Sequence, residues 1–163
     1  MKHVIHEIDP VFDAASRILI LGSFPSVKSR EGQFFYHHPQ NRFWAVLSRV
    51  LGVQKPETIE QKRAFLLQNK IAVWDVIASC DIEGSSDSSI RNVVPNDLSR
   101  ILAQSEVCQI FVNGKTAARL YQKYCEQQTG RPALTLPSTS PANAAWSLER
   151  LIEAWREAFQ DIL

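Results

Sequence analysis

Four short apolar runs, each bounded by turn-forming residues, constrain the fold of this chain more than any other feature of its sequence. The first, RILILG, is nearly continuous in apolar character and ends in glycine, as expected of a strand buried on both faces of a parallel sheet. Three similar runs, rich in branched or aromatic residues, follow it. We therefore expect strands over Arg17–Gly22, Ile71–Ile77, Cys108–Gly114 and Ala133–Leu136.

Stretches with helical spacing lie between these runs and after the last one. The period predicts a helix over Arg42–Leu51, with a buried stripe formed by Phe43, Val46, Leu47, Val50 and Leu51. A final helix repeats apolar residues from Leu148 to Ile162, and Ser147 stands where its cap is expected. Further helices are predicted over Pro56–Asn69 (core candidates Ile59, Phe65 and Leu66), Pro95–Gln104 and Thr116–Gln127.

Strands that alternate with helices imply right-handed crossovers and a mainly parallel sheet covered on both faces. The sequence thus predicts an α/β fold, a three-layer α/β/α sandwich of about four strands. With 163 residues and 45% hydrophobic content, we expect one domain over residues 1–163. Ligands of such sheets bind at the carboxyl ends of the strands, which directs attention to four loops: Ser23–Asn41, Ala78–Val94, the Gly114 turn and Pro137–Trp146. The polar segment Gly84–Ser89 is expected to be mobile.

Composition excludes several classes of protein. No apolar stretch approaches the roughly 18–20 residues of a membrane span, and MKHVIHEIDP has no signal-peptide features, so a cytoplasmic protein is expected. The net charge of +1 excludes a strongly basic, histone-like binder, although a local cluster can still hold phosphates. Cys80, Cys108 and Cys125 are widely separated and are expected to be reduced thiols. Adjacent His37 and His38 lack a partner at ligand spacing, so we expect neither a metal nor another cofactor.

Two of the predicted loops carry residues suited to a planar ligand and a phosphate. In the first, Gly22, Ser23 and Ser26 allow close backbone approach, while Phe34–Tyr36 offer flat faces. The alternative is that these rings pin the loop to the core. The second, LPSTSPANAAW, combines small residues, prolines and hydroxyls just before a helix, which suits a sugar-phosphate backbone. Its alternative is an ordinary strand-to-helix connection with capping serines.

Together the two loops resemble those of a known family. GSFPS followed by HHPQNRFW resembles the first motif region of the uracil-DNA glycosylase superfamily, especially its mismatch-specific and deoxyinosine branches. STSPAN (residues 138–143) sits where that superfamily has its DNA-intercalation motif. The resemblance spans nearly the whole chain, including SLERLIEAWRE, and implies the fold predicted above and activity on damaged DNA.

Two departures from the superfamily's pattern bear on chemistry. Phe24 stands where the mismatch-specific branch has a catalytic Asn, and it cannot orient a water molecule. The resemblance to the deoxyinosine branch implies that Asn41, in the H-P-x-N string, takes over as the catalytic residue; the alternative is an N-cap of the following helix, and both roles can coexist. Ser138 stands where the best-known uracil enzymes have His, so stabilisation of the leaving group by an imidazole is lost there.

The resemblance also implies a division of labour for base flipping. Tyr36 is expected to stack on the extruded base, with Gly22, Ser23 and Phe24 beside it. Asp75 and Asn113, near predicted strand ends, could bind the base edge; the alternatives are that Asp75 caps a loop and Asn113 shapes the turn before Gly114. The residues expected to contact DNA are Ser26, Lys115, Ser138, Ser140, Pro141, Ala142, Asn143 and Ala144.

The resulting prediction is a monofunctional, monomeric glycosylase that removes hypoxanthine from DNA. A uracil or mismatch glycosylase on the same scaffold is the first alternative, opposed by Phe24 and Ser138. A catalytically silent nucleic-acid-binding module is the second, because Phe24 removes the usual water-activating residue. A generic small-molecule hydrolase is disfavoured because G-x-S-x-G, P-loop and Rossmann glycine motifs are absent from the sequence.

Overall fold

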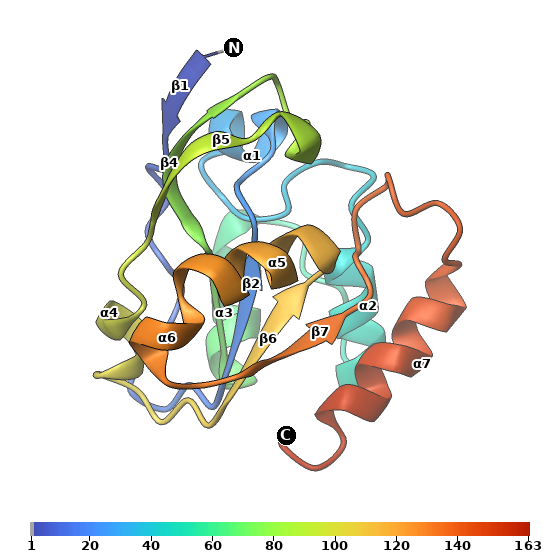
Figure 1. Cartoon of the computed structure of the whole chain (residues 1–163). Coiled ribbons are helices and arrows are strands. Elements are labelled where there is room, and N and C mark those ends of the chain that lie inside the picture. The colour runs from blue at the N-terminus through green and yellow to red at the C-terminus, as the bar shows by residue number, and fades with distance from the viewer. Residues whose placement is uncertain (1) are drawn as a thin grey trace.

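A four-stranded parallel sheet lies at the centre of the computed structural model, which describes residues 2–163 (Figure 1). Its strand order is β3 (Ile71–Asp75), β2 (Ile18–Gly22), β6 (Gln109–Asn113) and β7 (Ala133–Leu136). Every residue of β2 and β3 is buried, as continuous apolar runs require. All four predicted strands are confirmed; the ends of β7 are as predicted, and those of the other three differ by at most two residues.

Helices cover both faces of this sheet. The chain moves outward in one direction from β2 to β3 and in the other from β6 to β7, so right-handed crossovers place their helices on opposite faces. In Figure 1, α5 (Lys115–Tyr124) and α6 (Glu126–Thr129) lie in front of the sheet, while α2 (Phe43–Leu51) and α3 (Ile59–Gln68) lie behind it. The three-layer sandwich is confirmed, and the change of direction between β2 and β6 leaves a crevice at their carboxyl ends.

The helix α7 (Leu148–Phe159) follows β7 and packs against α2. The predicted stripes are confirmed at their centres, because Phe43, Val46 and Leu47 of α2 are buried. On α7 the buried residues are Leu151, Ile152, Trp155 and Phe159. The Ser147 hydroxyl accepts a hydrogen bond from the Arg150 amide at 3.2 Å, so the predicted cap is also confirmed.

The prediction of a loop over Ala78–Val94 is wrong. A second, antiparallel sheet with the order β1 (Lys2–Ile5), β4 (Ile77–Ile82), β5 (Arg91–Pro95) occupies most of that segment. Its strands are only partly buried and carry serine, aspartate and asparagine, so they lack the apolar signature of the central sheet. A short helical turn, η1 (Asp87–Ser89), lies between β4 and β5.

Several predicted helices have different bounds. The one expected over Pro95–Gln104 shrinks to α4 (Ser99–Leu102), because Pro95 ends β5. The helix predicted over Pro56–Asn69 is α3, which begins after the capping box of Thr58 rather than at Pro56. Ile59 is exposed, so it was wrong as a core candidate, while Phe65 and Leu66 are buried. The predicted helix over Thr116–Gln127 is divided between α5 and α6. The six-residue α1 (Val27–Gly32) was not predicted.

Two further features complete the fold. All three cysteines are free; Cys80 and Cys125 are buried and Cys108 is exposed. Burial raises the pKa of Cys125 to about 11. Within residues 2–163, no helix combines the length and the apolar character that a membrane crossing requires.

Candidate active site

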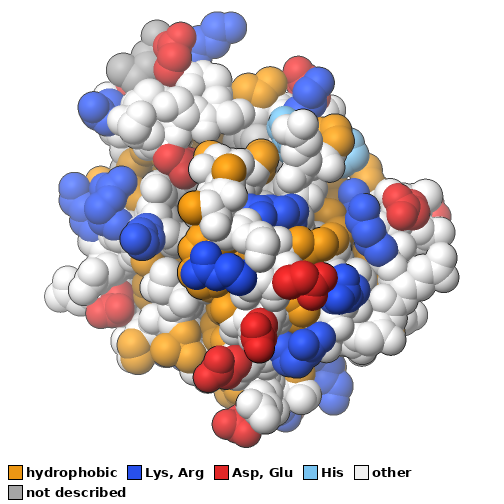
Figure 2. Space-filling view, turned by 90° about the vertical axis from the view of Figure 1, so that its right-hand side faces the viewer, with side chains coloured by type: hydrophobic (Ala, Val, Ile, Leu, Met, Phe, Trp, Pro, Cys, Tyr) orange, Lys and Arg blue, Asp and Glu red, His pale blue; other side chains and the backbone are white. Residues whose placement is uncertain are grey.

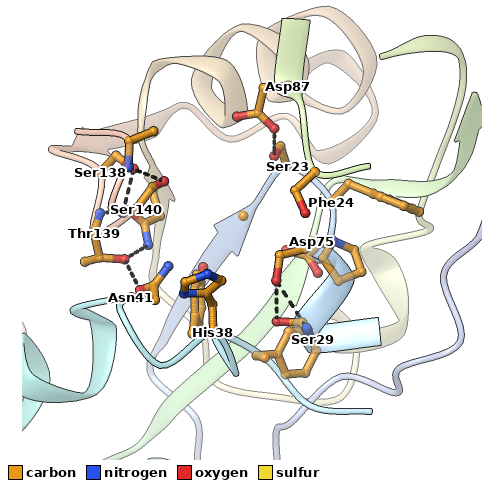
Figure 3. A pocket seen from close by; sticks show the side chains of 18 of the residues that line it. Ser23, Phe24, Ser29, His38, Asn41, Asp75, Asp87, Ser138, Thr139 and Ser140 are labelled. Atoms are coloured by element: carbon orange, nitrogen blue, oxygen red, sulfur yellow. Dashed lines mark hydrogen bonds between the residues drawn. The ribbon is translucent and has the colours of Figure 1, made fainter. Parts of the chain in front are cut away.

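A cavity of about 360 Å³ opens where the four parallel strands end (Figure 3). Gly22 ends β2, Asp75 ends β3 and Asn113 ends β6, while Ser138–Ala142 follows β7. The cavity therefore lies where the strand-end rule places a ligand, between the two motif loops. Its volume falls within the roughly 300–1,000 Å³ of small-ligand pockets.

Most of the predicted site residues are brought together here. Those that line the cavity are Gly22, Ser23, Phe24, Ser26, Tyr36, Asn41, Asp75, Asn113, Ser138, Ser140, Pro141 and Ala142. Lys115 and Asn143 instead line a neighbouring groove of about 490 Å³, which shares Ser138 with the cavity. Ala144 lines neither and is exposed. The two ends of the chain thus meet at one site.

The aromatic run of the first loop divides between core and cavity. Phe34 and Phe35 are 1% and 2% exposed, and Phe34 stacks on Trp44. Phe34 therefore pins the loop to the core, which was the alternative to a role in ligand stacking. Phe35 also borders the cavity. Tyr36 has one ring face stacked on Phe43, with ring centroids 3.9 Å apart and planes at 14°. A ligand can therefore stack only on the other face of Tyr36.

Tyr36 is also strained and incompletely hydrogen-bonded. Its φ of 50° lies in the left-handed region that residues other than glycine seldom adopt. Its buried hydroxyl has no hydrogen-bond partner within the described residues. Burial, and then the nearby Asp75 carboxylate, raise the pKa of Tyr36 far above its ordinary value, although the Asn113 side chain close to the hydroxyl acts in the opposite direction, so the hydroxyl keeps its proton. Strain and an unpaired polar group of this kind are typical of a ligand site.

The side chain of Asn41 joins the start of α2 to the second loop. Its Oδ1 accepts from the Phe43 amide and from the Thr139 hydroxyl, each at 2.9 Å. The capping role is therefore present. Because the Phe43 N–H needs an acceptor, the orientation of the amide group is fixed, and both lone pairs of Oδ1 are used. Within residues 2–163 its Nδ2 makes no hydrogen bond, and Asn41 lies at the cavity edge (Figure 3).

Thr139 connects the two loops to the sheet, and sequence reasoning missed it. It is fully buried, and its amide donates to Asn113 Oδ1 at 3.1 Å while its hydroxyl accepts from Asn113 Nδ2 at 3.0 Å. Its carbonyl accepts from the Arg42 amide at 3.1 Å. Asn113 thus anchors the second loop to β6. This is a structural role, as in the alternative given for Asn113, but it acts on a distant loop rather than on the turn before Gly114.

Arg42 holds the second loop by its backbone. Its guanidinium donates to the carbonyls of Trp146, of Asn143 at 3.1 Å and of Ser140 at 3.2 Å. The serines of this loop shape it locally, since the Ser138 hydroxyl oxygen accepts from the Ser140 amide at 3.1 Å. Pro141, Ala142 and Ala144 are exposed. The loop is therefore held at its base, with small residues outermost.

Two carboxylates and one imidazole also line the cavity, and of these only Asp75 was predicted as a site residue. Asp75 is 4% exposed and its Oδ2 lies 2.8 Å from Nε2 of His6. Asp87 lies in an exposed turn, but its carboxylate faces the cavity mouth, where partial burial raises its pKa although the Ser23 hydroxyl donates to it at 3.2 Å. His38 lines the cavity and accepts from the Gln40 amide.

Charge outside the cavity is mixed, and no metal cluster is present in the described part of the chain. Figure 2 shows Lys and Arg side chains interspersed with Asp and Glu on the face turned toward the viewer, in keeping with the net charge of +1. Across residues 2–163, no three His, Cys, Asp or Glu side chains are grouped so as to hold a metal ion.

Ser26, a predicted DNA contact, caps α1: its hydroxyl oxygen accepts a hydrogen bond from the Ser29 amide at 3.1 Å.

The chain is thus an α/β/α protein whose pocket, at the switch point of a parallel sheet, is bordered by an aromatic face and by polar groups. Within that class, the chain belongs to the uracil DNA glycosylase superfamily, whose model matches residues 10–161. The resemblance found in the two loops is thereby confirmed.

Two proteins of Methanosarcina species are similar to this chain over most of its length. A protein of Methanosarcina acetivorans named hypoxanthine DNA glycosylase is 34% identical over 152 residues, which cover 92% of this chain and 94% of the relative. A protein of the same name from Methanosarcina barkeri is 33% identical, covering 93% of this chain and 95% of its own. A solution NMR structure of a candidate uracil DNA glycosylase from Methanosarcina acetivorans superposes with a TM-score of 0.80 at 34% identity, covering 94% of each chain.

Proposed function

We propose that this chain, acting as one monomeric domain over residues 1–163, is a monofunctional DNA glycosylase that removes hypoxanthine from DNA during base excision repair in the cytoplasm. One observation carries the proposal: both motif loops border a single cavity that contains a stacking face, an unpaired amide donor and a carboxylate. The names of the two Methanosarcina relatives support hypoxanthine as the substrate.

Base flipping brings the target bond into the cavity. The C1′–N bond of a stacked nucleotide is inaccessible, so the nucleotide swings out at a cost of a few kcal/mol, which is least for a poorly paired base. The free face of Tyr36 receives the extruded base, and stacking of this kind contributes about 1–3 kcal/mol. Gly22, Ser23 and Phe24 form the adjoining wall. Stacking thus offsets the unpairing without selecting the base.

Asn41 holds the attacking water. Since Oδ1 is already used twice, the amide donates through Nδ2 to the water oxygen and leaves a water lone pair for C1′. The C1′–N bond breaks with its electron pair on the base, the water oxygen bonds to C1′, and the water proton leaves to the departing base or solvent. An oxocarbenium-like sugar is a strong electrophile, so positioning suffices. No lysine nucleophile takes part, and the strand is not nicked.

The polar residues at the strand ends face the edge of the base. Asp75 has one carboxylate oxygen free after its bond to His6 and can accept a hydrogen bond from a base N–H. Asn113 keeps one amide hydrogen and one lone pair after its bonds to Thr139, so it can still donate to or accept from the base. These residues supply the contacts that stacking lacks.

The second loop contacts the DNA backbone. The Ser138 and Ser140 hydroxyl oxygens accept from backbone amides, which leaves their own protons free to donate to phosphate oxygens. Lys115, in the adjoining groove, supplies a positive charge. Ala142–Ala144, together with Pro141 and Asn143, enter the duplex near the vacated space. Ser26 remains a predicted phosphate contact, although its hydroxyl now caps α1.

Excision assays on matched oligonucleotides test the proposal. Duplexes that differ only in one nucleotide, deoxyinosine, deoxyuridine or deoxyxanthosine, are incubated with the protein, and abasic sites are cleaved with alkali. We expect release of hypoxanthine to be fastest, with strand breaks only after alkali. Faster release of uracil would favour the uracil or mismatch glycosylase, which the superfamily's name supports. No release of any base would favour the silent binding module.

Asn41→Ala tests the water site in the same assay. We expect single-turnover release of hypoxanthine to fall about 10²–10³-fold, the loss that follows removal of one preorganised donor. Asn41→Asp keeps the oxygen that accepts from Phe43 and Thr139 but removes the donor, so it should lose activity similarly. Gln40→Ala, at the exposed neighbouring position, is the matched control. Undiminished activity of Asn41→Ala would reject this role.

A further inference from the structure

A buried histidine stands behind the cavity, outside both motif loops. His6 follows β1, and its side chain is 1% exposed. Its Nδ1 accepts from the Ile8 amide at 3.2 Å, so in the neutral ring the proton is on Nε2. Nε2 therefore donates to Oδ2 of Asp75, 2.8 Å away. The backbone of the N-terminal segment thus fixes the tautomer that faces the carboxylate.

The surroundings hold this pair in one orientation. The His6 ring lies against Phe24, Phe35 and Trp74, with centroids 6.0, 6.2 and 6.4 Å away. Asp75 is 5% exposed at its side chain, and its second oxygen, Oδ1, lies directly beside Gly22. A Cβ at position 22 would overlap that oxygen. Glycine at the end of β2 therefore gives Oδ1 the room it needs at the floor of the cavity.

The same end of the cavity holds the unpartnered hydroxyl of Tyr36. A Cβ on Gly22 would lie 3.1 Å from the Tyr36 hydroxyl oxygen, so this oxygen and Oδ1 of Asp75 approach the same point. The hydroxyl has no hydrogen-bond partner within residues 2–163. Two buried oxygens with unused hydrogen-bonding capacity are typical of the end of a cavity that receives the polar edge of a ligand.

We propose that His6 is a positioning residue that holds Asp75 with Oδ1 as a fixed acceptor, so that the cavity selects an extruded base with a ring N–H at that edge. Hypoxanthine carries a hydrogen on N1, which Oδ1 accepts. Adenine and unsubstituted purine present a lone pair at N1, which a carboxylate repels. This inference rests on the proposed function and names how the same site distinguishes a deaminated purine from its parent.

A purely structural role for the pair is the competing explanation, and the chain contains its own control. His3 and Asp81 form a second pair, with Nδ1 and Oδ1 3.0 Å apart, which joins β1 to β4. Its side chains are 59% and 28% exposed. Both histidines belong to the same N-terminal segment, but only His6 contacts a residue that lines the cavity.

The test measures selectivity as well as rate. Binding is measured on duplexes that carry hydrolysis-resistant 2′-fluoroarabino nucleotides of hypoxanthine or unsubstituted purine, and excision is measured on deoxyinosine. His6→Phe keeps an aromatic ring but removes the donor; we expect excision to fall about 10–100-fold, as for loss of a hydrogen bond to a charged group, and the binding preference for hypoxanthine to disappear. His6→Gln, whose amide can donate to Oδ2, should restore most of both.

Asp75→Asn and His3→Phe complete the design. In Asp75→Asn the His6 N–H donates to the amide oxygen, so the NH₂ group is turned toward the base. The side chain hardly changes in size, but the preference for hypoxanthine should be lost. His3→Phe should change neither readout. A folded His6→Phe that keeps the preference, or loses affinity equally for both duplexes, would overturn the inference. If His6→Phe does not fold, a retained preference in Asp75→Asn decides against it.

Failure of this inference is distinguishable from failure of the proposed function. An unmodified chain that releases hypoxanthine, with His6 and Asp75 variants that keep its selectivity, would leave the glycosylase proposal standing and remove only the role of His6. An unmodified chain that releases no base would remove both.

Discussion

The two loops that enclose the cavity are held by different forces. The first is anchored by aromatic rings in the core, chiefly Phe34 and Phe35, which are almost fully buried. The second packs on the core only at its ends, Leu136 and Trp146; between them it has no buried apolar residue and is held by hydrogen bonds from Arg42 and through Thr139. Burial of rings is non-directional, whereas these hydrogen bonds fix the position of each backbone group.

This difference suits the two tasks that we propose. A wall that stacks a base needs a flat, immobile surface, and the first loop provides Tyr36 supported by Phe43. A segment that presses on DNA needs small exposed residues on a firm base, and the second loop provides them above the Arg42 contacts. Apolar anchoring should therefore control folding stability, and polar anchoring should control the alignment of Asn41.

Phe34→Ala tests the apolar anchor and should have the largest effect. Removing a fully buried phenylalanine costs about 3–5 kcal/mol of unfolding free energy. We expect a loss of this size in urea unfolding, with an unchanged m-value. Val27→Ala, at a partly exposed site on α1, is the control and should cost far less. Similar losses for the two variants would show that the ring is not the anchor.

Thr139→Val tests the polar anchor without changing its size. The variant leaves Asn113 Nδ2 without its partner and takes one of the two donors from Asn41 Oδ1, at a cost of about 1–3 kcal/mol for a buried unpaired group. We expect lower stability and slower excision, because Asn41 is no longer held. Thr135→Val, exposed on β7, controls for the substitution. Excision that stays at the rate of the unmodified chain would separate Thr139 from the water site.

Tyr36→Ala tests the stacking surface of the first loop and should have a smaller effect. Excision should weaken by about 1–3 kcal/mol of transition-state stabilisation, the worth of base stacking, while the fold remains intact. Tyr36→Phe keeps the ring and removes the unpartnered hydroxyl, so stacking should survive. Single-turnover rates and circular dichroism check both variants. A clean fold with an unaltered rate in Tyr36→Ala would reject the stacking role.

The contrast also explains what the sequence predicts well. Buried strands such as Ile18–Gly22 are recognisable as continuous apolar runs, and buried helix faces such as that of α7 as apolar residues at helical spacing. The central sheet and its helices could therefore be predicted. The edge sheet was missed because β4 and β5 are partly exposed and carry polar residues. The spacing of apolar residues in a sequence indicates which side chains are buried, so strands that are only half-buried are harder to recognise.

The site divides in the same way. Residues inside the two motif loops, such as Tyr36 and Asn41, could be named because the motifs mark them. The residues that hold the site side chains in place could not be named from the sequence. Thr139 lies 98 positions from Asn41, to which it is hydrogen-bonded, and His6 lies 69 positions from Asp75. Nothing local distinguishes Thr139 from the serines beside it, or His6 from the exposed His3. A buried Asp at a strand end is the one sequence signal that calls for a hidden partner.

A crystal structure of Asn41→Ala bound to a duplex containing deoxyinosine would show whether the two loops together enclose a flipped-out base. We expect hypoxanthine outside the helix, stacked on the free face of Tyr36 with its N1 edge toward Asp75, and Ala142–Ala144 against the duplex. A hypoxanthine still paired within the helix, or DNA bound to a face away from the two loops, would contradict it.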